Sequence, residues 1–377
     1  MTSNDNTSLS PMPLIGSSRH HVPASTATQT KELAKSMGFI NLFLITLPFA
    51  IIGGAVKWPP TIVFILNFIA IVPLAKLLGI ATEEIAFRTS QSIGGLLNAS
   101  FGNAVEMILS IVALKEGLIR VVQASLLGSI LSNLLLVLGF CFVAGGLKHK
   151  EQRFNMTAAQ TSSSLMTMSV MSLLVPAAMM ASSPAIEIPE NNNSLLALSH
   201  GTAIILLCLY ILYLIFQLRT HVHLYADDEG DEEEEPILSV PYAISLLVIV
   251  TILVSVCAEF LVGSIEVVSS SWGLSETFIG LILLPIVGNA AEHVTAVTVA
   301  MKNKMNLAIG VAIGSSMQIA LFVTPFLVIV GWFMGQNLTL FFHTFETSVM
   351  FISVLIVNYL IQDGTSNWLE GNLRIQL

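Results

Sequence analysis

Long apolar segments constrain this chain more than any other feature. A helix that crosses the hydrocarbon core of a bilayer needs about 20 mostly apolar residues. The sequence contains ten such segments, at residues 37–56, 60–81, 94–114, 121–146, 157–181, 195–217, 241–262, 275–301, 306–333 and 344–361. Only 10% of the residues are charged, against about 25% in a soluble domain. We therefore predict an all-α, multi-pass protein whose partner is the lipid bilayer and which binds no nucleic acid.

The basic residues of the loops predict the orientation of the chain. With the N-terminus in the cytosol, the opposite side of the membrane holds only Lys57, Lys115 and Arg120, and the cytosolic side holds the other loop residues of this kind. Lys and Arg are enriched in cytosolic loops, so we expect a cytosolic N-terminus. Residues 1–36 are polar and rich in Ser and Thr, which predicts a disordered cytosolic tail.

An acidic run separates the sixth and seventh segments, within a predicted cytosolic linker at residues 218–240. Its members are Asp227, Asp228, Glu229, Asp231, Glu232, Glu233, Glu234 and Glu235. The run lacks the ordered ligand spacing of an EF-hand loop, which favours a solvated linker. The alternative is that its negative potential concentrates Ca²⁺ near the cytosolic entrance.

A five-residue motif occurs twice inside the apolar segments. Gly102-Asn103-Ala104-Val105-Glu106 recurs 186 residues later as Gly288-Asn289-Ala290-Ala291-Glu292, and Gly128-Ser129 recurs at the same offset as Gly314-Ser315. The copies lie on the third and eighth segments, so their helices run in opposite directions. This predicts an inverted-topology repeat, with residues 58–217 and 241–370 as the two halves and residues 37–57 as an extra helix.

The repeated motif has the composition of a cation site. A glutamate at bilayer depth costs about 2.5–3.5 kcal/mol on insertion scales, so it is seldom there without a function. Ca²⁺ accepts six to eight oxygen ligands, and glycine permits a helix break that exposes carbonyl oxygens. We expect the site to use Glu106, Glu292, Gly102, Asn103, Gly288, Asn289, Ser129, Ser315 and Gln318. The alternatives are glutamates that are protonated or paired with a buried base, and Gly-Ser pairs that serve only helix packing.

Three further residues are candidates for an ion or proton pathway. Glu83 lies near the end of the second segment, Glu259 lies deep in the seventh, and His293 adjoins Glu292. No His-Glu-x-x-His spacing, nucleophile elbow or phosphate-binding loop is present in the sequence, so we expect no enzyme activity and no cofactor.

The two motif segments resemble the signatures of the cation/proton exchanger family, the Ca²⁺/H⁺ branch of the wider cation/calcium exchanger superfamily. Residues 96–106 are similar to its first signature and residues 280–293 to its second. The acidic linker and the extra first helix are also similar, and the overall pattern indicates a fungal vacuolar member.

The resemblance implies a function and a membrane. It implies that Glu106 and Glu292 bind Ca²⁺, and that cytosolic Ca²⁺ is exchanged for vacuolar H⁺ across the vacuolar membrane. It also implies eleven helices, whereas residues 371–377 are too short and polar to span, so we expect a second repeat without its closing helix. Two alternatives are open: an exchanger of Mn²⁺ or another cation, and a non-transporting truncated isoform that associates with the full-length exchanger.

Overall fold

The computed structural model describes residues 25–182, 193–222 and 236–375, and this part of the chain is nearly all helical. The first half contains α1 (Thr26–Met37), η1 (Gly38–Ile45), α2 (Thr46–Ala55), α3 (Pro60–Ala86), α4 (Gln91–Phe101), α5 (Ala104–Lys115), α6 (Ile119–Leu131), η2 (Ser132–Val137), α7 (Leu138–Lys148), β1 (Gln152–Arg153), α8 (Met156–Ser182), α9 (Asn193–Ile215) and η4 (Phe216–Thr220). The second half contains α10 (Val240–Val262), α11 (Ile265–Trp272), α12 (Glu276–Phe278), η6 (Ile279–Leu283), α13 (Leu284–Met301), α14 (Met305–Gln318), η7 (Ile319–Val323), α15 (Thr324–Met334), α16 (Thr344–Leu360), β2 (Thr365–Ser366) and α17 (Trp368–Ile375). The two short strands pair with each other in antiparallel orientation.

The helices confirm a multi-pass membrane protein. In the described residues, eight helical stretches are long and apolar enough to cross a bilayer: Thr26–Ala55, Pro60–Ala86, Ile119–Lys148, Met156–Met180, Asn193–Thr220, Val240–Val262, Glu276–Met301 and Met305–Met334. Helix α16 is apolar but shorter. The span predicted at 94–114 is not one helix, because the chain leaves helical geometry between α4 and α5.

The N-terminal segment differs from its prediction. Residues 26–36 were expected to be disordered but form most of α1. This helix buries Gln29, Leu33 and Met37, and their spacing of four residues places them on one face. The Gln29 side-chain oxygen accepts hydrogen bonds from the backbone N–H and the hydroxyl of Ser239, at 2.9 and 3.1 Å. Packing against a distant segment therefore orders a stretch whose composition alone favours disorder, while residues 1–24 and the acidic run lie outside the described residues.

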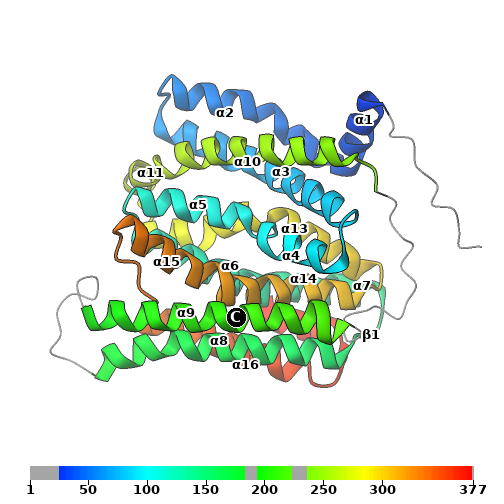
Figure 1. Ribbon diagram of the computed structural model, residues 1–377, viewed down its shortest axis with the longest axis vertical. Coiled ribbons are helices and arrows are strands. Elements are labelled where there is room, and N and C mark those ends of the chain that lie inside the picture. Colours follow the sequence, from blue (N-terminus) through cyan, green and yellow to red (C-terminus); the bar gives the residue numbers. More distant parts are fainter. Residues whose placement is uncertain (1–24, 183–192, 223–235, 376–377) are drawn as a thin grey trace, which may run out of the picture.

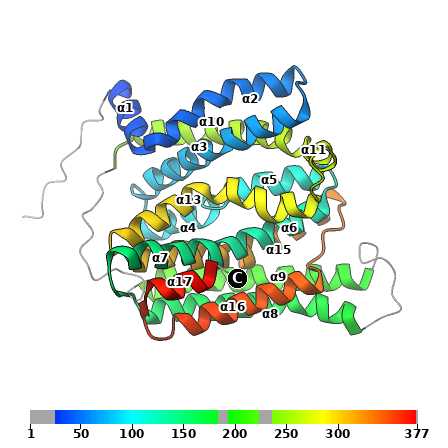
Figure 2. The same cartoon turned by 180° about the vertical axis from the view of Figure 1, so that it is seen from behind.

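The helices form layers across the molecule. Figures 1 and 2 show α2, α3 and α10 along one side and α8, α9 and α16 along the opposite side. The motif helices α4, α5 and α13 lie between these layers, next to α6 and α14. Helix α3 packs along α10, and both also contact the motif helices: α3 contacts α13, and α10 contacts α5.

The sequence duplication has a counterpart in the backbone. The π-helical segment η2 follows the pair Gly128-Ser129, and η7 follows Gly314-Ser315. The repeat offset superimposes most of η2 on η7. A π-turn within an α-helix is rare and is often found at functional sites, so its presence at matching places supports the pairing of α6–α7 with α14–α15.

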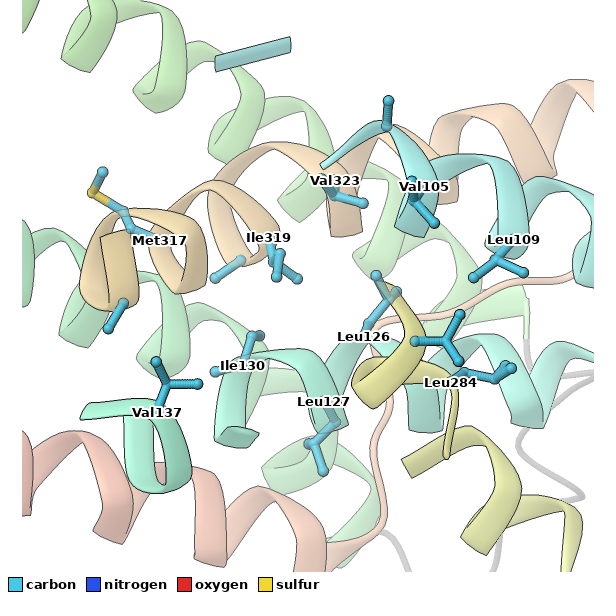
Figure 3. Close-up of a cluster of buried hydrophobic side chains, with 14 of the residues drawn as sticks. Val105, Leu109, Leu126, Leu127, Ile130, Val137, Leu284, Met317, Ile319 and Val323 are labelled. Carbon is cyan, nitrogen blue, oxygen red and sulfur yellow. The ribbon is translucent and has the colours of Figure 1, made fainter. Parts of the chain in front are cut away.

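An apolar cluster joins the two halves beside the motifs. Figure 3 shows Val105 and Leu109 of α5, Leu127 of α6, Leu284 of α13 and Met317 of α14 within one group of buried side chains. All five side chains are at most 3% exposed. Each motif helix therefore has an apolar face fixed in the core, which holds its polar residues in place.

Candidate functional site

The first motif interrupts a helix and begins a new one. Helix α4 ends at Phe101 and α5 begins at Ala104, with Asn103 in a non-helical conformation (φ −105°, ψ 27°). Glu106 lies in the first turn of α5 and is buried, with 5% exposure. The N-terminus of a helix carries a partial positive charge that favours a nearby carboxylate, so the break places Glu106 where the start of α5 partly offsets the cost of its burial.

The second motif has the same Gly-Asn-x-x-Glu pattern without the break. Helix α13 continues from Leu284 to Met301 through Gly288 and Glu292. A Cβ atom at Gly288 would lie 2.5 Å from Oε1 of Glu106, closer than real Cβ contacts allow. The carboxylate of the first motif therefore occupies the space left by the glycine of the second, one helical turn before Glu292.

Both glutamates have carboxylate oxygens without hydrogen-bond partners. In the described residues, Oε1 of Glu106 and Oε2 of Glu292 are buried and accept no hydrogen bond, and neither glutamate takes part in a salt bridge between described residues. The two groups are close enough to interact electrostatically. Because a buried, unpaired charge is costly, this pair of carboxyl groups requires either a cation or protons.

The other motif residues connect the two halves. Oδ1 of Asn103 accepts a hydrogen bond from the Ser315 hydroxyl at 3.1 Å. Nδ2 of Asn289 donates to the Ser129 hydroxyl at 3.2 Å. The asparagine of each motif is thus bonded to the Gly-Ser pair of the opposite repeat. Nδ2 of Asn103 also donates to Oε1 of Gln318 at 2.7 Å, so these side chains have structural partners besides any ion.

The two Gly-Ser pairs differ in their surroundings. A Cβ atom at Gly128 would collide with the backbone carbonyl of Leu281, whereas nothing lies within 4 Å of one at Gly314. Helix packing therefore accounts for the first glycine, as the alternative reading of these pairs proposed. Gly314 instead borders open space.

A cavity of about 720 Å³ reaches the two motifs. Its lining includes Glu292 together with Gly102, Gly288, Ser315 and Gln318. The cavity extends to Asn155, just before α8, and to Asn306, at the start of α14. It therefore connects Glu292 with one end of the helix bundle. Glu106 is not among the lining residues and lies behind Gly288.

The three predicted pathway residues lie in different surroundings. Glu83 lines the cavity and interacts electrostatically with Glu292. His293 does not line it; its Nε2 lies 3.2 Å from Oδ1 of Asn133, across the interface between the halves. Glu259 is not brought to the site: its side chain is 59% exposed and pairs with Lys115 at 3.1 Å. The face of α10 that bears Cys257, Ala258 and Leu261 is buried instead, which turns Glu259 outward.

Several polar residues that line the cavity were not among the predicted site residues. Asn98, Gln217 and Lys76 are three of them. Asn98 lies one turn before Gly102 within the first signature, and Gln217 is a polar residue at the end of the sixth apolar segment. Lys76 is a basic residue well inside the second segment, and its ammonium group donates to the carbonyl oxygens of Ser36 and Met37 at 3.0 and 3.3 Å. Polar residues inside apolar segments were the available signal.

Comparison with known families agrees with this architecture. The family model described as sodium/calcium exchanger protein matches residues 59–219 and 242–375, which include both motifs and leave out the acidic linker. The chain belongs to this family. The exchanger is 50% identical over 367 residues to the vacuolar calcium ion transporter of Schizosaccharomyces pombe, covering 95% of this chain and 88% of that protein. It is 48% identical over 354 residues to a Ca²⁺/H⁺ antiporter of Synechocystis sp., covering 88% and 94%.

A solved structure supports the same assignment. The exchanger resembles native YfkE, a Ca²⁺/H⁺ antiporter, with a TM-score of 0.77 and 38% sequence identity, over 90% of this chain and 96% of that one. The family resemblance that the two signatures indicated is confirmed, and with it an all-helical, polytopic exchanger fold.

Proposed function

We propose that this exchanger is a Ca²⁺/H⁺ antiporter of the vacuolar membrane, in which Glu106 and Glu292 form one site that Ca²⁺ and protons occupy in turn. The observation that carries the proposal is that both glutamates present buried oxygens without protein partners at the meeting point of the two motifs. The similarity to a vacuolar calcium ion transporter of Schizosaccharomyces pombe and to a Ca²⁺/H⁺ antiporter of Synechocystis sp. supports the choice of ions and membrane.

The ligand chemistry suits a hard divalent cation. Two carboxylates balance the charge of Ca²⁺, and the chain leaves helical geometry between α4 and α5 next to Gly102, where backbone carbonyl oxygens can turn towards an ion. Ca²⁺ takes such oxygens at about 2.3–2.6 Å in flexible geometry. Ser315 and Gln318 line the cavity beside Glu292 and supply neutral oxygens. Asn103 and Asn289 hold the two repeats at the spacing that the ion requires.

Exchange follows from competition for the same carboxylates. Ionised Glu106 and Glu292 hold Ca²⁺, and protonation of both removes the charge that held it. In an acidic lumen the two glutamates therefore release Ca²⁺ and take up protons. The neutral site then carries these protons to the cytosol. Each pH unit across the membrane contributes about 1.4 kcal/mol per proton, so the two protons that this site carries help to drive Ca²⁺ against its gradient.

The cavity supports entry of Ca²⁺ from the cytosol. It extends to the turns before α8 and α14, next to Arg153 and Lys304, which the distribution of basic residues assigns to the cytosolic side. Glu83 lines the route and adds negative charge on the way to Glu292. A carboxylate in a confined cavity raises the local concentration of cations.

Uptake of radioactive Ca²⁺ into vesicles with an acidic interior tests the proposal. We expect Glu106→Gln and Glu292→Gln each to abolish uptake, because the amide keeps the shape but neither binds the ion strongly nor releases a proton. Glu259→Gln is the matched control: it changes a glutamate within a spanning helix that lies outside the site, and it should keep wild-type uptake.

Competition by unlabelled cations tests the substrate. Excess Ca²⁺ should suppress uptake of the label more strongly than Mn²⁺ at equal concentration.

Substantial uptake by either glutamine variant would remove that glutamate from the site. Uptake that persists after the pH gradient is collapsed would refute proton coupling.

A further inference from the structure

The cavity of this cation exchanger has a lysine in its wall. Among its described lining residues, Lys76 is the basic one, and Glu83 and Glu292 are the acidic ones. Lys76 and Glu83 lie seven residues apart on α3, which places them about two helical turns apart on the same face. A lysine has a long, flexible stem and a compact charge, so a mobile ammonium here competes with an incoming cation for these carboxylates.

The structure keeps that ammonium occupied elsewhere. Nζ of Lys76 donates to the carbonyl oxygens of Ser36 and Met37, at 3.0 and 3.3 Å. These two residues end α1. The last carbonyls of an α-helix accept no hydrogen bond from that helix and carry a partial negative charge. Helix α1 ends at Met37, which is also the N-cap of the 3₁₀ helix η1, and the carbonyls of Ser36 and Met37 at this junction bind the ammonium.

Helix α1 is itself anchored away from the cavity. Leu33 and Met37 are buried, with 7% and 1% exposure. Gln29 accepts two hydrogen bonds from Ser239, and the Thr30 hydroxyl lies 3.0 Å from the Tyr242 hydroxyl. Figure 1 shows α1 at the end of α2, beside α3 and the start of α10. The position of the two carbonyls is therefore set by contacts that involve neither motif.

From this arrangement we propose that α1 sets the apparent Ca²⁺ affinity of the exchanger by holding the Lys76 ammonium away from the carboxylates of the cavity. The inference rests on the proposed Ca²⁺/H⁺ exchange and assigns a role to a helix that lies outside both repeats. Release of α1 frees the Lys76 ammonium, which then competes with Ca²⁺ for the carboxylates and raises the KM for Ca²⁺. The maximal rate is unchanged, because saturating Ca²⁺ displaces the ammonium from the carboxylates.

The test uses the full chain in vesicles and compares four forms: wild type, Leu33→Asp, Lys76→Met and the double variant. Leu33→Asp places a charge in the buried contact of α1 and should release the helix. We expect it to raise the KM for Ca²⁺ roughly tenfold, the effect of one unit charge at about 10 Å in a partly solvated cavity. Lys76→Met should change the KM less than about twofold on the same scale, and the double variant should match Lys76→Met.

Two further variants strengthen the comparison. Met37→Cys, made in a chain whose exposed Cys208 is replaced by alanine, reports the release of α1, because this buried position should react with a maleimide only when the helix is undocked. If Leu33→Asp does not fold, Gln29→Ala combined with Thr30→Ala removes only side-chain hydrogen bonds and is used in the same scheme. Lys76→Arg with Leu33→Asp should keep the raised KM, since the charge remains.

The outcomes separate this inference from the proposed function. A KM raised equally in the Lys76 and Lys76→Met backgrounds, or unchanged although Met37→Cys has become reactive, overturns the role of Lys76. Absence of proton-driven Ca²⁺ uptake by the wild-type chain refutes the proposed function instead. Normal wild-type uptake, together with a Leu33→Asp effect on the KM that is the same with and without Lys76, refutes this inference alone.

Discussion

At the scale of single residues, the site requires the glycine of the second motif as well as the two glutamates. Gly288 leaves the space that the Glu106 carboxylate occupies, with 2.5 Å between Oε1 and a Cβ atom built on the glycine. The atom that a methyl group would meet is the far end of a side chain, so the carboxylate gives way more easily than the backbone. A side chain larger than glycine at position 288 should therefore weaken ion binding and leave the fold intact.

Gly288→Ala tests this contact. We expect the variant to fold and to show a KM for Ca²⁺ raised roughly tenfold or more, since overpacking costs about 1–3 kcal/mol. Gly314→Ala is the matched control, because nothing lies within 4 Å of its Cβ position. KM values from pH-gradient-driven uptake provide the measurement. Equal effects of the two substitutions would show that the close approach of Glu106 is unimportant.

At the scale of helices, reciprocal hydrogen bonds hold the two repeats together. Asn289 on α13 reaches Ser129 on α6, and Ser315 on α14 reaches Asn103 at the start of α5. All four residues are at most 8% exposed. Such bonds between helices in a membrane contribute about 0.6 kcal/mol on average and at most about 1.7, so we expect a small but measurable coupling.

A double-mutant cycle measures that coupling. Asn289→Ala and Ser129→Ala should each lower the thermal stability of the protein in detergent, and their combination should be less destabilising than the sum by about 0.5–1.5 kcal/mol. Ser245→Ala combined with Ser129→Ala is the control pair, since the Ser245 hydroxyl bonds only to a carbonyl of its own helix in the described structure. Additive behaviour of Asn289 and Ser129 would contradict a direct bond between the repeats.

At the scale of the whole molecule, the cavity makes the two membrane faces inequivalent. Thr295 lines it nearly one turn after Glu292, while the exposed residue Glu116 lies at the opposite end, just after α5. With a cytosolic N-terminus, the first position is reached from the cytosol and the second from the lumen.

Cysteine labelling tests this asymmetry. Cys208 is exposed and is first replaced by alanine, while Cys141 and Cys257 are buried. We expect Thr295→Cys to react with a membrane-impermeant thiol reagent added on the cytosolic side, and Ca²⁺ to slow the reaction. Glu116→Cys should react only from the lumenal side. The reverse pattern would invert the proposed orientation.

Much of the fold was predictable from local patterns. Long apolar segments identified a multi-pass helical protein, and the repetition of Gly-Asn-x-x-Glu at one offset identified the family and two helices of opposite direction. These inferences succeed because hydropathy and duplication are properties of the chain itself. The same reasoning misjudged residues 26–36, whose polar composition favours disorder although burial of Leu33 and Met37 against distant helices makes them helical.

The details of the candidate site depended on packing between residues far apart in the sequence. The shared Gly-Asn-x-x-Glu pattern gave a helix that is interrupted at Asn103 and one that is continuous through Gly288. Glu259, deep in an apolar segment, faces outward to Lys115. Local composition shows which residues are ionisable and that the motif glutamates occur as a pair. Which of their oxygens lack a hydrogen-bond partner, and where Lys76 points, depend on how the helices pack, because a partner or a vacant space is supplied by another helix.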